Sequence, residues 1–179
     1  MRLSPLVACG LLWGHVANAQ SSGAAGSAVS VRVEGAVDHP YTLDATELAA
    51  MPRREVTASG HGSPSARYEG VLLRTVLERA GVELGPALRG PRLASYVAID
   101  ATDGYRVVFA LAELDSAFTT RRVLLADRVD GRPLPADAGP MRIIVSDETR
   151  PARWVRKVSR IRVLSAPSAD AAPHPEVPR

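Results

Sequence analysis

Basic side chains gather near the end of this chain, where they could bind an anion. Between residues 142 and 162 the basic residues are Arg142, Arg150, Arg153, Arg156, Lys157, Arg160 and Arg162. Only Asp147 and Glu148 oppose them in that segment. Guanidinium groups match the geometry of phosphate and carboxylate. The cluster therefore indicates a site for a phosphorylated ligand, an anionic surface or nucleic acid, and a solvated basic surface is the alternative.

Other kinds of chemistry have little support in the sequence. Cys9 is the only cysteine. Removal of the first residues would leave no disulfide, no thiolate nucleophile and no sulfur ligand from cysteine. We find no paired carboxylates, no Ser/His/Asp order, no histidine cluster with metal spacing and no phosphate-binding glycine loop. No metal site is therefore expected from the residues themselves.

The first nineteen residues have the features of a secretory signal peptide. Arg2 precedes a mostly apolar run over residues 3–16, and Ala17-Asn18-Ala19 is a typical cleavage site before Gln20. The apolar run is too short to span a bilayer. A lipoprotein signal ending at Cys9 is the minor alternative. We expect a periplasmic protein without a transmembrane helix in its mature form, and export argues against a nucleic-acid partner.

Composition divides the rest of the chain into three parts. Residues 20–28 are rich in Gly, Ser and Ala and read as a flexible linker. Residues 165–179 form a Pro/Ala-rich segment that we expect to be a disordered tail. A single domain over residues 29–164 is large enough to bury a core.

The first half of this domain predicts short strands and two helices. Strands are expected at residues 29–35, 41–43 and 54–59. Asp44 with Glu47 forms a capping box for a helix that ends before Pro52. Residues 60–65 read as a loop, and residues 71–81 as a helix that buries Leu72, Leu73, Val76, Leu77 and Ala80.

The second half predicts mostly strands. These are residues 95–101, 105–110, 123–126, 141–145 and 161–164, with Asp103-Gly104 and Asp130-Gly131 as hairpin turns. Residues 111–114 suggest a single helical turn. A helix over residues 153–158 would bring Arg153, Arg156 and Lys157 near one face. The predicted class is α+β, a mixed and mostly-β domain with a few short helices.

The order of these motifs resembles one known family. The motifs are Val33-x-Gly35 with Pro40, Tyr68-x-Gly70-Val71-x-Leu73, Val76-Leu77-x-x-Ala80-Gly81, Asp103-Gly104-Tyr105, Asp130-Gly131-x-Pro133-Leu134, Gly139-Pro140-x-Arg142 and Arg153-Trp154-Val155-Arg156-Lys157-Val158. Together they resemble the oxidoreductase molybdopterin-binding domain, the catalytic domain of sulfite oxidases and their bacterial periplasmic relatives. The resemblance covers residues 29–164 and implies the sulfite-oxidase fold.

The resemblance also implies a cofactor site and a missing ligand. Family members hold the pterin with arginines, histidines and a late basic segment, which here gives His61, Arg142, Arg153, Arg156 and Lys157 as candidates. Their molybdenum is bound by one cysteine, and that position falls on Ala58 here. We therefore expect no cysteine-ligated molybdenum. The resemblance implies molybdopterin as the cofactor if one is bound. Ser59 is an alternative oxygen ligand, and His61 is alternatively an ordinary loop residue.

Two classes of function follow from this degenerate active site. The first is a periplasmic molybdopterin-dependent oxidoreductase of sulfite-oxidase type with a non-standard metal site, its catalytic residues unassigned. The second is a non-catalytic binding module for a pterin or another anionic small molecule, or a partner subunit of a redox protein. The resemblance favours the first, and the missing thiolate favours the second.

Export gives a direct prediction. N-terminal sequencing of the protein isolated from its native host should find Gln20 as the first residue, because signal peptidase cleaves after a small-x-small motif. An intact Met1 in a cytosolic fraction would contradict export. A lipid-modified Cys9 would replace this interpretation with a membrane-anchored one.

Overall fold

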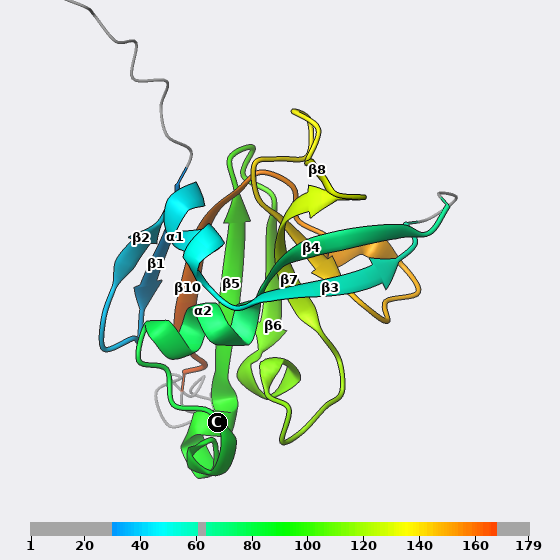
Figure 1. Ribbon diagram of the computed structural model, residues 1–179. Helices are drawn as coiled ribbons and strands as arrows, with labels where there is room; N and C mark the ends of the chain where they lie inside the picture. Colours follow the sequence, from blue (N-terminus) through cyan, green and yellow to red (C-terminus); the bar gives the residue numbers. More distant parts are fainter. Residues whose placement is uncertain (1–29, 61–63, 168–179) are drawn as a thin grey trace, which may run out of the picture.

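The computed structural model describes residues 30–60 and 64–167, and these form one mixed and one antiparallel sheet (Figure 1). The first has the order β2 (Tyr41–Leu43), β1 (Val31–Gly35), β10 (Val158–Ser165), β5 (Ser95–Ala101) and β6 (Arg106–Ala110). The second has the order β3 (Arg53–Ala58), β4 (Ala66–Leu72), β7 (Val123–Val129) and β8 (Arg132–Pro133), with β9 (Arg142–Val145) also paired to β7. Among the strands of the described residues, only β1 and β10 run parallel. The predicted α+β class is confirmed.

Helices are few and short. They are α1 (Ala45–Ala50), α2 (Leu73–Arg79) and the 3₁₀ turns Gly85–Ala87, Gly90–Ala94, Leu111–Leu114 and Pro151–Arg153. The predicted capping box is present, because the Glu47 amide donates to the Asp44 carboxylate at 2.8 Å. The Asp44 amide in turn donates to the Glu47 carboxylate. This reciprocal pair satisfies donors that the first helical turn would otherwise leave free.

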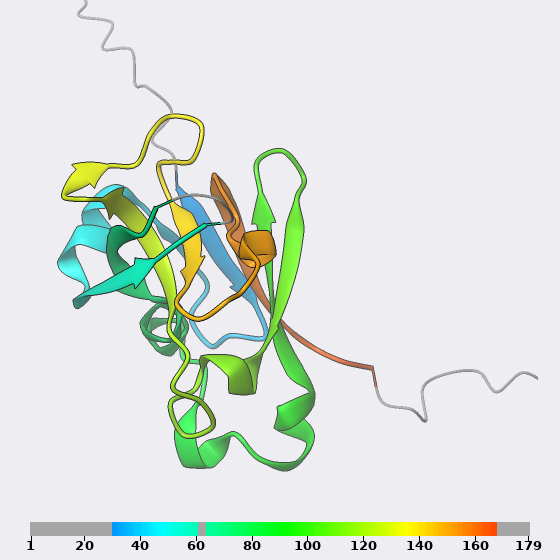
Figure 2. The ribbon, with the colours of Figure 1, turned by 90° about the vertical axis from the view of Figure 1, so that its right-hand side faces the viewer.

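One hydrophobic core joins both sheets. Along β1 the side chains of Val31 and Val33 are fully buried while Arg32 between them is exposed, as the two-residue period of a strand requires. Ile99 and Phe109 from the first sheet belong to the same buried cluster as strand residues of the second. Figure 2 shows the two sheets from the side, with β5 and β6 on the right and the second sheet on the left.

The second sheet depends on a close approach between β4 and β7 at Gly70. A Cβ at this position would lie 2.1 Å from the Leu125 carbonyl oxygen and 2.6 Å from the Ala126 Cα. The register of the two strands shifts next to it, between Glu69 and Gly70. Only glycine permits this approach, which explains the Tyr-x-Gly motif in physical terms.

Two predicted elements differ from the structure. The helix expected from residue 71 begins only at Leu73, because Val71 and Leu72 belong to β4, which is hydrogen-bonded to β7 and, through Val71, to β3. Leu72 is consequently a half-buried strand residue, while Leu73, Val76, Leu77 and Ala80 are fully buried as predicted. The helix expected over residues 153–158 does not form, and β10 begins already at Val158.

Apart from the predicted domain, the predicted segments fall largely outside the described residues. The expected signal peptide, the linker and most of the expected tail lie outside the described residues. At the carboxyl end β10 reaches Ser165, one residue past the predicted domain limit. Among the described residues no helix is both long and apolar enough to cross a membrane.

Candidate functional site

The second sheet places Arg142 in a row of small residues on one face. Register pairs Arg142 with Ala126, Ala126 with Gly70, and Gly70 with Arg54. Paired residues of neighbouring strands point to the same face. Tyr68, two residues before Gly70, therefore shares that face. Because Ala126 and Gly70 have little or no side chain, the long side chain of Arg142 has room to extend along the sheet.

The guanidinium of Arg142 packs against two aromatic rings. Its Cζ is 5.4 Å from the ring centroid of Trp154 and 5.9 Å from that of Tyr68. The two rings meet edge to face, with centroids 5.7 Å apart. Both aromatic residues are buried, with Trp154 only 5% exposed. Cation–π contacts of this kind hold a guanidinium in one orientation without neutralising its charge.

Two donors at this position have no acceptor within the described residues. These are the buried Nε of Arg142 and the buried Nε1 of Trp154. Burial lowers the pKa of the Arg142 guanidinium from its usual value, and the positive charge of Arg156 adds to that lowering. Arginine nevertheless stays charged at neutral pH. A half-buried cation with free donors is the chemistry expected of an anion-binding group.

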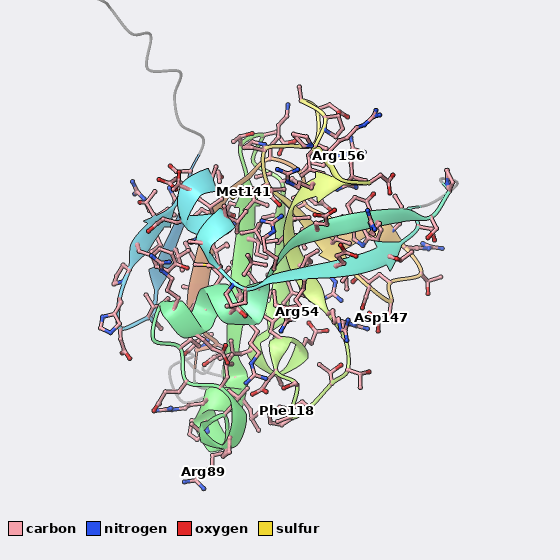
Figure 3. All side chains as sticks on the ribbon, viewed as in Figure 1. Arg54, Arg89, Phe118, Met141, Asp147 and Arg156 are labelled. Atoms are coloured by element: carbon pink, nitrogen blue, oxygen red, sulfur yellow. The ribbon has the colours of Figure 1, made fainter. Side chains whose placement is uncertain are left out.

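Arg156 lies close enough to Arg142 to affect its charge, whereas Lys157 lines a separate hollow, and no helix joins them. Arg156 is exposed and pairs with Asp137 at 3.4 Å, and Figure 3 shows it near β8 at the upper end of the molecule. Lys157 has a left-handed backbone, with φ of 49°, and its amide donates to the Ala138 carbonyl. The Lys157 side chain helps to line a hollow of about 480 Å³ formed by Thr102, Leu134, Ala136, Gly139 and Pro140.

Arg153 is held by carboxylates, which corrects the prediction that it shares a face with Arg156 and Lys157. Its Nη1 binds Glu113 at 3.1 Å, and its Nε binds Glu148. Its guanidinium also lies 4.4 Å from the Phe109 ring centroid. Burial alone would lower the pKa of Arg153, but the bond to Glu148 and the charges of Glu113 and Glu148 outweigh it and raise that pKa. These contacts give Arg153 two carboxylate partners, so it presents less charge to a ligand than Arg142 does.

The predicted helix over residues 153–158 fails because its backbone groups bond elsewhere. The Val155 carbonyl accepts from Ile143, the Val158 amide donates to Met141, and the Lys157 carbonyl accepts from Thr102. These long-range bonds tie the segment to β9 and to the turn after β5. A spacing that would suit a helix is therefore overridden by tertiary contacts.

The position that resembles the metal-ligand cysteine lies on the same face as the Arg142 site. Ala58 ends β3, pairs with Ala66 and is 7% exposed. It follows Val56, which pairs with Tyr68, by two residues, so the face is the same. Ser59 is exposed, and His61 lies outside the described residues. The described residues contain no group of three or more His, Cys, Asp or Glu side chains placed to bind a metal.

An anionic pterin and a thiolate-bound metal fit these residues differently. The free donors of Arg142 and Trp154 suit a phosphorylated or pterin-like ligand. The donor set does not suit a thiolate-ligated molybdenum, because Ala58 has no sulfur and Cys9, the only cysteine, lies outside the described residues. Sequence reasoning did not select Tyr68 as a site residue, although its motif marked it.

Comparisons with known proteins agree with this architecture. A family model described as "Oxidoreductase molybdopterin binding domain" matches residues 21–172. The solved structure of the sulfane dehydrogenase SoxCD from Paracoccus pantotrophus is similar, with a TM-score of 0.60 and 19% sequence identity over 75% of this chain. The match covers 37% of the SoxCD chain, so the two share a fold over part of that longer protein. No curated protein matches this sequence.

The carboxylate contacts of Arg153 give a prediction for stability. Replacing Arg153 with alanine leaves Glu148, whose side chain is 11% exposed, without its cationic partner. We expect the free energy of unfolding in a denaturant titration to fall by about 2 kcal/mol. Arg150→Ala is the control, because Arg150 is exposed and pairs with no carboxylate among the described residues. Equal stability of the two variants would contradict a structural role for Arg153.

Proposed function

Because the chain belongs to the oxidoreductase molybdopterin binding domain family, we propose that it is a ligand-binding form of that fold. It binds molybdopterin or another phosphorylated, pterin-like anion at Arg142, and it holds no thiolate-ligated molybdenum. The protein acts in the periplasm after removal of its signal peptide.

The state of Arg142 carries the proposal. Among the arginines of residues 30–60 and 64–167, it is the only one that is partly buried and has no carboxylate within 4 Å. Desolvating a guanidinium costs free energy unless an anion compensates it. A ligand that brings its own negative charge would supply the missing partner. Arg156 would add a second, weaker contact, because it is exposed and shares its charge with Asp137.

Catalysis of the sulfite-oxidase type is the second candidate, supported by the family match. It would need a metal ligand other than cysteine at the Ala58 position. The side chain of Ser59, next to that position, is exposed and offers an oxygen. Soft thiolate is the preferred ligand of this metal site, and a serine oxygen is a harder donor. The donor set therefore favours the binding module over the enzyme.

A redox partner is also part of this proposal. The match covers 37% of the SoxCD chain, and we propose that the domain shared with it works beside a redox protein. A small binding domain of this kind would act as a subunit that carries or presents the ligand. The structure describes this chain alone.

The absent thiolate gives a spectroscopic prediction. In X-ray absorption of the protein matured in its own host, any molybdenum should have only the sulfur neighbours that a bound pterin supplies. No sulfur neighbour should come from the protein. The reason is that no cysteine follows Cys9 in the sequence. Ala58→Cys is the matched variant, since it returns a thiol to the position that resembles the ligand. An additional sulfur neighbour at stoichiometric molybdenum in the unmodified protein would contradict the proposal.

The affinity for the ligand gives a prediction for Arg142 and Arg156. In a calorimetric titration with molybdopterin or a phosphorylated pterin analogue, Arg142→Gln should weaken binding about tenfold to a hundredfold, because a shielded charge-assisted contact is lost. Arg156→Ala should weaken it by only about twofold to fivefold, since that side chain is exposed. Arg150→Ala should bind as the unmodified protein does. Unchanged affinity in Arg142→Gln, with the fold intact, would remove Arg142 from the binding site.

A further inference from the structure

The outer face of the first sheet holds two arginines as direct neighbours. Arg32 on β1 pairs in register with Arg160 on β10, and on its other side with Thr42 on β2. Both arginine side chains are exposed, by 64% and 46%. Neighbouring strands lie about 4.8 Å apart, so the pairing fixes two positive charges close together.

This arrangement is electrostatically incomplete. Like charges directly opposite one another destabilise a sheet. One carboxylate serves both arginines, since Glu34 lies 3.9 Å from the Nε of Arg32 and 3.5 Å from the Nε of Arg160. Within residues 30–60 and 64–167 neither arginine has another carboxylate within 4 Å. The group therefore keeps one surplus positive charge at a point where the backbone holds the cations together.

Hydroxyl groups complete a shallow hollow around these cations. Ser30, Arg32, Thr42, Ser159 and Arg160 line a depression of about 200 Å³. Ser159 is fixed there, because its hydroxyl donates to the Asp100 carbonyl at 3.1 Å. Ser30 and Thr42 make no side-chain hydrogen bond to other described residues, so their hydroxyls are available as donors. No carboxylate lines the hollow.

We propose that this hollow binds a tetrahedral oxyanion of the phosphate or sulfate type, either free or as the phosphate of a monoester or lipid headgroup. Two guanidinium groups and two hydroxyls offer donors to several oxygens at once, as phosphate recognition requires. The anion neutralises the surplus charge between Arg32 and Arg160. The site is separate from Arg142, which belongs to the second sheet. Its exposure limits the affinity for a free ion to the order of millimolar.

Thermal unfolding at constant ionic strength tests the proposal, with phosphate exchanged against chloride. Phosphate at about ten times the dissociation constant should raise the Tm of the unmodified protein by roughly 3–6 °C. Arg32→Gln and Arg160→Gln should each lose at least about half of that rise. Arg132→Gln should keep it, because Arg132 is an exposed arginine on β8, which belongs to the other sheet. Without phosphate, Arg32→Gln should be no less stable than the unmodified protein, since Arg160 then keeps Glu34 to itself.

Amide chemical shifts locate the ion, and vesicles identify its source. Phosphate should move the amide resonances of Ser30, Arg32, Thr42 and Arg160 in a saturable manner. Sedimentation with phosphatidylcholine vesicles that contain phosphatidylglycerol tests the headgroup, and it should depend on Arg32 and Arg160 if the source is lipid. The site is supported if the phosphate-induced rise in Tm or the sedimentation with vesicles is lost in both Arg32→Gln and Arg160→Gln. The proposal is overturned if all variants show the same rise in Tm and the same sedimentation, or if the unmodified protein shows neither.

Discussion

The contact between the backbones of β4 and β7 at Gly70 sets the geometry of the second sheet. Two strands can approach so closely only where one has no side chain, and the Leu125 carbonyl occupies the space a Cβ would need. The register shift beside it leaves Asp127 unpaired in the ladder, and Asp127 turns to bind Arg53 through both carboxylate oxygens. Ala126, on the other face, leaves space for Arg142. One glycine thus fixes a strand pairing, an ion pair and the position of the candidate binding group.

Positive charge in this protein is carried almost entirely by arginine, and most of the described arginines bind carboxylates of the same chain. Arg53, Arg74, Arg121, Arg153 and Arg162 are all partly buried and each binds a carboxylate. Asp115 and Asp100 are among the carboxylates that these contacts bury. Paired arginines stabilise the fold but present little net charge to a ligand. The number of arginines in a segment therefore says less about binding than the contacts of each one, and Arg153 and Arg142 illustrate the two cases.

Local signals in the sequence predicted the elements that depend on local contacts. The capping box of Asp44 and Glu47 formed as its spacing required, and the family motifs led to the correct fold. The boundary between β4 and α2 was misplaced, because the strand passes into the helix at Leu72 without any turn residue. The segment after Arg153 was misassigned because its backbone bonds to residues that are distant in the sequence, such as Ala138 and Met141. The carboxylates that neutralise Arg153 could not be found from spacing. The roles of Arg142 and Arg156 in binding stay predictions.

The packing of Arg142 against Trp154 has an optical consequence. The sequence contains two tryptophans, and Trp154 is the only one within the described residues. Its indole is buried, and its face touches the same guanidinium that would meet an incoming anion. Any change in the charge or position of that guanidinium alters the electric field across the ring, and with it the energy of indole emission. The domain therefore contains an intrinsic fluorophore at the centre of its candidate site, and occupancy can be followed without a label.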